Sequence, residues 1–170
     1  DKHYLGWRSK RLEGEEYLSF VGRFVRAFKN VFPNALCQWE DFFQHNAFSI
    51  RDAFVDEIIS FNDDIQGTGA ATMAAILSAM TIKKEDLTTK VFLIQGAGVG
   101  GVGIGEQIYN CLMDHGLSAE EASNRIFIID SEGLVTNERR LEFYKRKFAK
   151  DPDHFPWIKD LEKEDNLTII

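Results

Sequence analysis

The pattern of apolar and polar positions changes its period several times along the chain. Between Glu13 and Phe32 apolar side chains recur every three or four residues, which predicts a long amphipathic helix ending at the sequence FPNA. Short apolar runs and helical patterns then alternate. We expect a strand in 35–39, a helix in 42–54, a strand in 57–61 and a helix in 66–80.

The second half of the chain continues this alternation. The continuous apolar run VFLIQ (91–95) is typical of a parallel strand buried on both faces, and a glycine-rich turn with a helix (96–116) follows it. Ser118 is placed to cap a further short helix, and RIFIID (125–130) predicts another buried strand. The sequence therefore predicts an α/β fold: a Rossmann-like parallel sheet with crossover helices, forming an incomplete dinucleotide-binding domain.

Three regions follow from this reading. Residues 1–35 form an N-terminal helical segment, residues 36–135 a metal- and NAD-binding α/β core, and residues 136–170 a helical or loop tail. Within the tail, 139–150 can be helical and 151–157 reads as a loop. The final LTII is expected either to dock on the sheet edge as a last strand or to continue into a longer chain.

Composition narrows the possible partners. With 170 residues, 44% of them hydrophobic, the chain has the size and composition of one globular domain. The formal net charge of −7 argues against a nucleic-acid surface, because phosphate binding needs clustered cations, and the basic run in 139–150 is expected to be a solvated face. We expect Cys37 and Cys111 to be buried, reduced thiols.

The sequence carries no pattern of targeting to a membrane. No apolar run approaches the roughly 18 residues of a membrane span, and the first residues lack the pattern of a signal peptide. We therefore expect a cytoplasmic protein without a membrane partner.

Four carboxylates follow the two short strands of the first half. Glu40 and Asp41 follow one strand, and Asp63 and Asp64 follow the next. If these strands are neighbours, the carboxylates converge at the sheet edge where ligands bind, and Mg²⁺ or Mn²⁺ would compensate their charge. Alternatively, Glu40 and Asp64 cap the helices that follow them. The two acidic pairs together favour the metal.

Three glycines have the spacing of a dinucleotide-binding turn. Gly96, Gly98 and Gly101 form a G-x-G-x-x-G pattern directly after a predicted strand and before a predicted helix. Asp130 ends the next strand, about 30 residues on instead of the usual roughly 20, where it can accept from ribose hydroxyls or simply form a turn. The acidic residue favours NAD over NADP.

Four linked motifs carry a resemblance to a known family. The segments WEDFFQHNA (39–47), FNDDIQGTGA (61–70), FLIQGAGVGGVGIGEQI (92–108) and IIDSEGL (128–134) resemble the malic enzyme family, including its malolactic branch. The similarity runs from about Tyr4 to Leu134. It implies oxidative decarboxylation of L-malate to pyruvate and CO₂, with NAD and with Mn²⁺ or Mg²⁺ as cofactors.

The resemblance also implies roles for individual residues. The family's metal ligands fall on Glu40, Asp41 and Asp64, and Asp63 matches the aspartate that neighbours the catalytic lysine. The positions implied for cofactor binding are Gly96, Ala97, Gly98, Val99, Gly101 and Asp130. The family's catalytic lysine and tyrosine belong to sequence that precedes Asp1, so this chain alone is expected to turn over weakly or not at all.

Other functions remain open at this point. Trp39, where malic enzymes have phenylalanine, resembles the malolactic branch, which holds NAD tightly and converts L-malate to L-lactate and CO₂. A non-catalytic NAD-binding module would keep the glycine turn without the chemistry. A magnesium-dependent phosphate enzyme is disfavoured because no G-K-[ST] follows the glycines. We expect the chain to form homo-oligomers.

Overall fold

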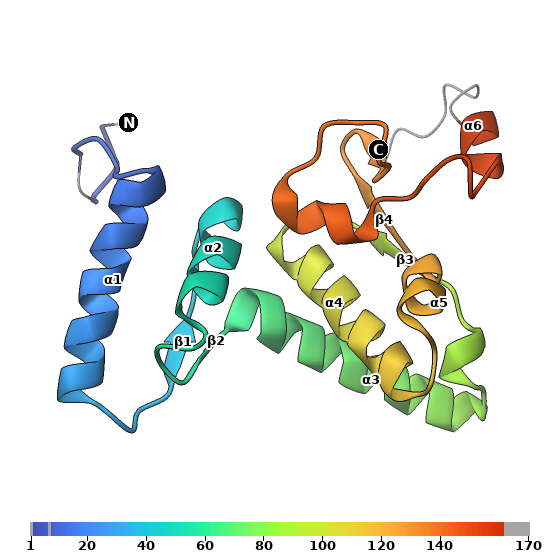
Figure 1. Ribbon diagram of the computed structural model, residues 1–170, viewed down its shortest axis with the longest axis horizontal. Coiled ribbons are helices and arrows are strands. Elements are labelled where there is room, and N and C mark those ends of the chain that lie inside the picture. The colour runs from blue at the N-terminus through green and yellow to red at the C-terminus, as the bar shows by residue number, and fades with distance from the viewer. Residues whose placement is uncertain (1, 7, 162–170) are drawn as a thin grey trace.

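The computed structural model describes residues 2–6 and 8–161 of the chain and has mixed α/β architecture (Figure 1). Its helices are α1 (Gly14–Val31), α2 (Gln44–Phe54), α3 (Thr68–Lys83), α4 (Val99–Asp114), α5 (Ala119–Asn124) and α6 (Trp157–Leu161). Its strands are β1 (Cys37–Trp39), β2 (Ser60–Asn62), β3 (Phe92–Gln95), β4 (Ile126–Asp130) and β5 (Gly133–Leu134). Three short helical turns complete it: π-helical η1 (Asp63–Gly67), and η2 (Leu87–Thr89) and η3 (Phe143–Phe148), both 3₁₀. The predicted α/β class is confirmed.

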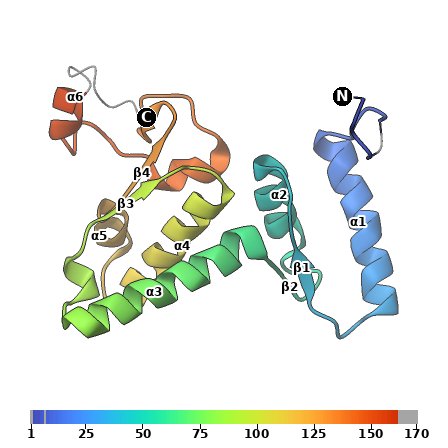
Figure 2. The same ribbon diagram turned by 180° about the vertical axis from the view of Figure 1, so that it is seen from behind.

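The strands form two small sheets, whereas the sequence pattern suggested one. β1 pairs with β2 in parallel, and β4 pairs with β3 in parallel and with β5 in antiparallel orientation. Figures 1 and 2 show α1, α2 and the first sheet on one side of the molecule, with α3 leading away to the second sheet and its helices. The alternation in the sequence predicts crossovers but does not specify which strands pair, and this accounts for the difference.

The predicted burial of β3 on both faces is wrong. Only Ile94 of this strand is buried, and Leu93 is 67% exposed. β3 pairs with β4 on one side alone, so within the described residues it is an edge strand. The apolar run of β3 is typical of a strand whose exposed face and unpaired edge are covered by other segments.

The helix after the first sheet is more apolar than the sequence reading allowed. An 18-residue window within Asp63–Lys83 has a mean hydropathy of 1.3, and by length and composition alone this segment would be long enough to cross a membrane. The expectation that no run approaches such a length is therefore corrected. One face of this helix packs against α4 through small residues: a Cβ added at Gly69 would lie 2.8 Å from the carbonyl oxygen of Gly103.

The buried apolar residues form two clusters, and α2 contributes to both. In the smaller cluster Val21 and Val25 of α1 pack with Ile50 and Phe54 of α2. The larger cluster surrounds α4 and includes Ile128 of β4. Burial of both clusters supplies most of the stabilisation, at about 25 cal/mol per Å² of apolar surface.

The tail is less helical than 139–150 suggested. Only η3 forms there, because the next residues return to the sheet: Lys150 donates its backbone N–H to Val135 O at 2.9 Å, and Asn137 donates to Lys150 O at 2.9 Å. This pairing requires extended backbone at Lys150 and ends the helical turn. The expected strand at LTII lies outside the described residues.

The glycines of α4 permit an unusually close approach to η1. A Cβ added at Gly103 would lie 2.2 Å from the carbonyl oxygen of Ile65 and 2.8 Å from two further backbone atoms of that residue. Because backbone cannot rotate away as a side chain does, only glycine fits at this position. The contact fixes α4 against the turn that follows β2.

We predict that Gly103→Ala lowers the free energy of unfolding by about 2 kcal/mol or more, since overpacking against a fixed backbone forces the helix to shift. Urea denaturation followed by circular dichroism measures this change. Gly100→Ala in the same helix is the control: its Cβ would meet Thr68 Cγ2 at an ordinary 3.5 Å, so that variant should be neutral or slightly stabilised. Equal stability of the two variants would contradict the close packing.

Lys150 is a buried cation without a carboxylate partner among the described residues. Its side chain is 2% exposed, its Nζ donates to Ser123 O at 2.5 Å, and it lies 4.9 Å from the ring centroid of Phe127. Burial lowers the pKa of Lys150 from 10.5 to about 8. The protonated form is therefore less favourable in the folded than in the unfolded chain.

The lowered pKa predicts that Lys150 makes stability depend on pH. Between pH 8 and 10.5 the unfolded chain binds more protons than the folded one, so the destabilisation caused by Lys150 is full below pH 8 and disappears as the pH rises. The difference in unfolding free energy between Lys150→Met and the unmodified chain should change by roughly 2–3 kcal/mol from pH 7 to pH 10. Exposed Lys29→Met is the control and should show no such dependence; a flat difference for Lys150→Met would refute the assignment.

Candidate functional site

Parallel pairing of β1 with β2 brings three carboxylates together. The register sets Trp39 opposite Asn62, so the residues that follow each strand leave the same edge of the sheet. One oxygen each of Glu40, Asp41 and Asp64 lies within 4.8 Å of the others. The sequence predicts that four carboxylates converge; this is confirmed for these three, and the fourth, Asp63, is not in the group.

The backbone around the cluster is arranged to hold it. Asp41 has φ +58°, a left-handed conformation that costs energy for a residue with a side chain, and its N–H donates to Asp64 Oδ2 at 3.0 Å. Gln38 Nε2 donates to Glu40 Oε2 at 3.0 Å. These bonds orient two of the three carboxylates and leave their remaining oxygens open.

Neither Glu40 nor Asp64 makes a side-chain cap, although Asp64 lies in the first turn of η1, where a negative charge is favourable. Asn62, and not Asp64, caps η1, since its side chain accepts from the N–H of Ile65 at 2.9 Å. The residue at the N-cap of α2 is Phe43, which offers no side-chain cap. Three oxygen donors with free positions between them fit a hard divalent ion such as Mg²⁺ or Mn²⁺.

Asp63 lies apart from this cluster. Its carboxylate packs against Gly67 at the end of η1, since a Cβ added at Gly67 would lie 2.1 Å from Asp63 Oδ1. It is half-buried at the start of η1, next to Asp64 in sequence but outside the group of three.

The glycine-rich turn joins β3 to α4 as its spacing predicts. Gly96 has φ +110°, which an L side chain rarely adopts, and a Cβ added at Gly101 would lie 1.8 Å from Gly96 O. Gly98 is the N-cap of α4 and has no side chain to satisfy the amides of the first turn. A helix start of this kind is suited to an anionic group such as a pyrophosphate.

Two neighbouring cavities lie along these elements. One, of about 460 Å³, is lined by Gly96, Ala97, Gly98, Asp130, Lys145 and Gln44. The other, of about 550 Å³, is lined by Asp41, Asp64, Val99, Gly100, Thr68 and again Gln44. The glycine turn and the carboxylate cluster therefore border adjoining spaces.

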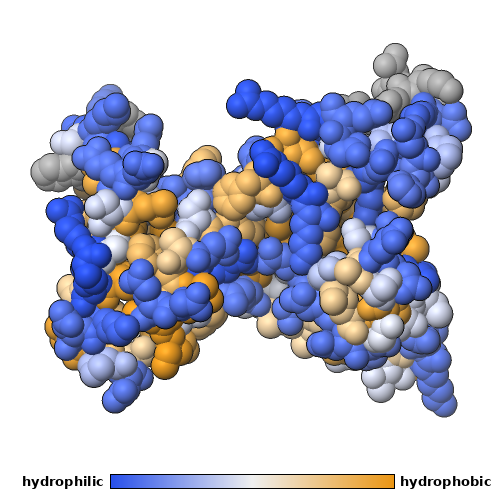
Figure 3. Space-filling model, viewed as in Figure 1, coloured by the Kyte–Doolittle hydropathy of each residue, from blue (hydrophilic) through white to orange (hydrophobic). Residues whose placement is uncertain are grey.

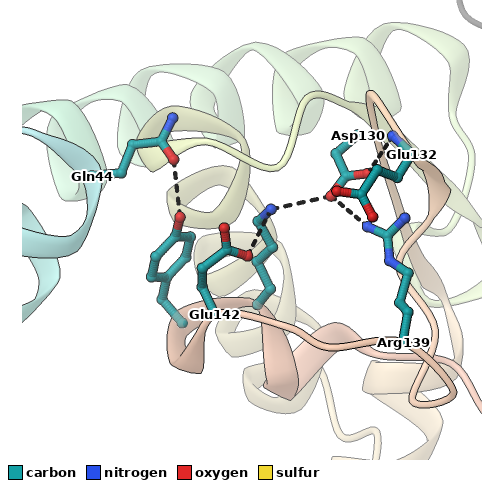
Figure 4. A network of polar contacts seen from close by, with 7 residues as sticks. Gln44, Asp130, Glu132, Arg139 and Glu142 are labelled. Carbon is teal, nitrogen blue, oxygen red and sulfur yellow. Dashed lines mark hydrogen bonds and ion pairs between the residues drawn. The ribbon is translucent and has the colours of Figure 1, made fainter.

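Asp130 is the centre of a polar network that the sequence did not indicate (Figure 4). Its Oδ2 accepts from Arg139 Nη2 at 2.5 Å and from Lys145 Nζ at 3.1 Å, and its Oδ1 accepts from the N–H of Glu132 at 2.9 Å. Burial alone would raise the pKa of Asp130, but these hydrogen bonds outweigh it and the pKa is lowered. Asp130 is therefore held ionised.

The basic run in 139–150 is not simply a solvated face, as the sequence suggested. The side chains of Arg139 and Lys145 are only 19% and 12% exposed because they pair with Asp130. Arg139 follows Asp130 by nine residues across a turn, a separation without any regular period, so sequence periodicity offers no signal for this pair.

Sequence reasoning also missed Gln44 and Tyr144. Tyr144 Oη donates to Gln44 Oε1 at 2.9 Å, joining residues 100 positions apart (Figure 4). The ring of Tyr144 stacks on Phe48, with centroids 4.6 Å apart and an angle of 6° between planes. Gln44 lies within the segment WEDFFQHNA, but nothing in that segment indicates a partner 100 positions away, and Tyr144 lies outside the four motifs.

Two family models match the chain. The model described as the NAD binding domain of malic enzyme matches residues 65–168, and the one described as the N-terminal domain of malic enzyme matches residues 1–55. Glu40 and Asp41 lie inside the N-terminal match, and Asp64 lies between the two matched segments, directly before residue 65.

Curated relatives match over almost the whole chain. It is 44% identical to the malolactic enzyme of Leuconostoc mesenteroides over 98% of the chain and 32% of that protein. It is 41% identical to the NAD-dependent malic enzyme of Erwinia tasmaniensis over 100% of the chain and 30% of that protein. The chain thus spans about a third of the length of these relatives.

Solved structures show the same fold. The NAD-dependent malic enzyme of Thermotoga maritima matches with a TM-score of 0.64 at 23% identity, over 84% of this chain and 36% of that one. The malic enzyme of Entamoeba histolytica matches with a TM-score of 0.62 at 26% identity, over 82% and 27%. Together with the family models and the linked motifs, these likenesses show that the chain belongs to the malic enzyme family.

Proposed function

We propose that the chain is the NAD- and divalent-metal-binding part of an enzyme that oxidatively decarboxylates L-malate to pyruvate and CO₂. The observation that carries this is the pair of adjoining cavities: one is bordered by the glycine turn, and the other by Asp41 and Asp64, two of the three convergent carboxylates. Family membership supports malate as substrate, and the name of the Erwinia relative supports NAD.

Each part of the site would have a separate task. Glu40, Asp41 and Asp64 would hold Mn²⁺ or Mg²⁺, while the turn from Gly96 to Gly101 would bind the pyrophosphate of NAD. The bound ion would supply electrophilic polarisation of the C2 oxygen of malate and NAD⁺ would supply the hydride acceptor, for an overall conversion of malate and NAD⁺ to pyruvate, CO₂ and NADH. Asp63 would adjoin the catalytic lysine of the family.

Asp130 would contact the adenosine ribose of NAD. Its carboxylate is ionised and borders the cavity of the glycine turn, where it can accept from hydroxyl groups. The neighbouring Arg139 and Lys145 hold it in place, leaving it with acceptor capacity on the open side.

A malolactic function is the second candidate. The observation that favours it is the 44% identity to the malolactic enzyme of Leuconostoc mesenteroides, together with Trp39 at the end of β1. In that case NAD would stay bound and the product would be L-lactate. Assay of the product formed from malate by the longer enzyme separates the two reactions.

We further propose a cytoplasmic homo-oligomer that has neither nucleic acid nor membrane as a partner. The net charge of −7 disfavours nucleic acid. Apolar side chains reach the surface on the half of the molecule that holds α1 (Figure 3), where Phe20, Phe24 and Phe32 are 50%, 51% and 56% exposed. Exposed apolar area of this kind favours association.

We predict that NAD binds this chain, and that Mn²⁺ with L-malate strengthens the binding. The adjoining cavities would bring the cofactor and the metal-bound substrate into contact, so their binding should be coupled. Calorimetric titration of NAD with and without Mn²⁺ and malate measures the coupling. If the affinity for NAD is the same with and without Mn²⁺ and malate, the chain is instead a non-catalytic NAD-binding module.

Asp64→Asn should weaken Mn²⁺ binding at least about tenfold, because it removes the charge of a ligand that the backbone of Asp41 orients. It should also abolish the effect of Mn²⁺ and malate on NAD binding while NAD still binds. Asp114→Asn, an exposed change at the far end of α4, is the matched control and should bind Mn²⁺ normally. Unchanged Mn²⁺ affinity in Asp64→Asn would overturn the assignment of the metal site.

A further inference from the structure

Gln44 lies between the two cavities of the site. It is the first residue of α2, three positions after Asp41, and it lines both the cavity of the glycine turn and that of the carboxylates. A Cβ added at Gly98 would lie 3.3 Å from Gln44 Nε2. The amide group therefore lies directly against the turn that is suited to a pyrophosphate.

The orientation of this amide is set by Tyr144. Because Gln44 Oε1 accepts the hydroxyl of Tyr144, the Nε2 donors are directed to the other side, toward the glycine turn. No described residue accepts a hydrogen bond from Nε2. Gln44 is exposed, and its two Nε2 donors face the cavity of the glycine turn without an acceptor among the described residues.

Tyr144 is held rigidly enough to fix this orientation. It is 7% exposed, and its ring stacks on Phe48, which is fully buried in α2. The next residue, Lys145, lines the cavity of the glycine turn and pairs with Asp130. The short turn η3 therefore positions groups at both ends of the same cavity.

We propose that Gln44 is a cofactor contact whose Nε2 donates to an oxygen of the dinucleotide, either on the pyrophosphate or on the nicotinamide ribose, and that Tyr144 is its positioning residue. This inference rests on the proposed function. Since Gln44 also borders the carboxylate cluster, the contact links cofactor binding to the loop that carries Asp41.

The test measures NAD affinity of the 170-residue chain by calorimetry. Gln44→Leu should weaken NAD binding about tenfold, the effect of losing one hydrogen bond to a charged or buried acceptor. Tyr144→Phe, which keeps the stacked ring, should weaken it about threefold. The double variant should bind no more weakly than Gln44→Leu alone, because Tyr144 acts through Gln44.

Two controls separate a contact from a structural effect. Tyr109→Phe on α4 loses a hydroxyl far from Gln44 and should bind NAD normally. Gln44→Asn keeps the donors but shortens the side chain by one methylene, and it should bind more tightly than Gln44→Leu. Thermal unfolding of each variant should match that of the unmodified chain.

Smaller ligands identify the acceptor. ADP carries the pyrophosphate and ADP-ribose adds the second ribose, so weakening of both by Gln44→Leu indicates the pyrophosphate, and weakening of ADP-ribose alone indicates the ribose. If the unmodified chain binds NAD but Gln44→Leu binds it equally well, the inference is overturned and the proposed function stands. Additive losses in the double variant overturn the role of Tyr144. Failure of the unmodified chain to bind NAD overturns the proposed function itself.

Discussion

The parallel pairing of β1 with β2 is the constraint on which the site depends. Each strand has only three residues, yet their register places Glu40 and Asp41 beside the turn that begins at Asp63. Antiparallel pairing would leave these acids at opposite ends of the sheet. The short pairing is enough to bring two loops to one edge of the sheet. Apolar residues of α1 and α2 pack against the strands and stabilise them.

A second constraint joins this small sheet to the glycine turn. The π-helical η1 carries the chain from β2 into α3, and α4 packs so closely on η1 that Gly103 meets the backbone of Ile65. The N-terminus of α4 is thereby placed beside Asp64, and Gly100 lies in the same cavity as that carboxylate. The small residues of α4 thus do more than shape the turn for a dinucleotide, since they set the separation of the two halves of the site.

Local patterns predicted much of this molecule, and pairings between distant segments account for most of what they missed. The order of elements, the glycine turn between β3 and α4 and the Ser118 cap depend on a few neighbouring residues, and all are found. The division into two sheets and the partners of Asp130 depend on how distant segments meet. Arg139 and Lys145 reach Asp130 because the chain pairs with the sheet again at Lys150, and this pairing orients η3. No local sequence pattern encodes that pairing.

The two acidic sites of this molecule differ in how their charge is compensated, and the difference bears on function. Asp130 is neutralised by two cations of the protein itself. In contrast, no described Lys or Arg pairs with Glu40, Asp41 or Asp64; Asp64 accepts from the backbone N–H of Asp41, and Glu40 accepts from the side-chain amide of Gln38. A purely structural cluster would be expected to carry its own cations, as Asp130 does, because three adjacent carboxylates repel one another. The left-handed backbone at Asp41 directs its N–H to Asp64, so the three carboxylates stay close together without a cation of the protein, and this closeness supports the proposed divalent ion.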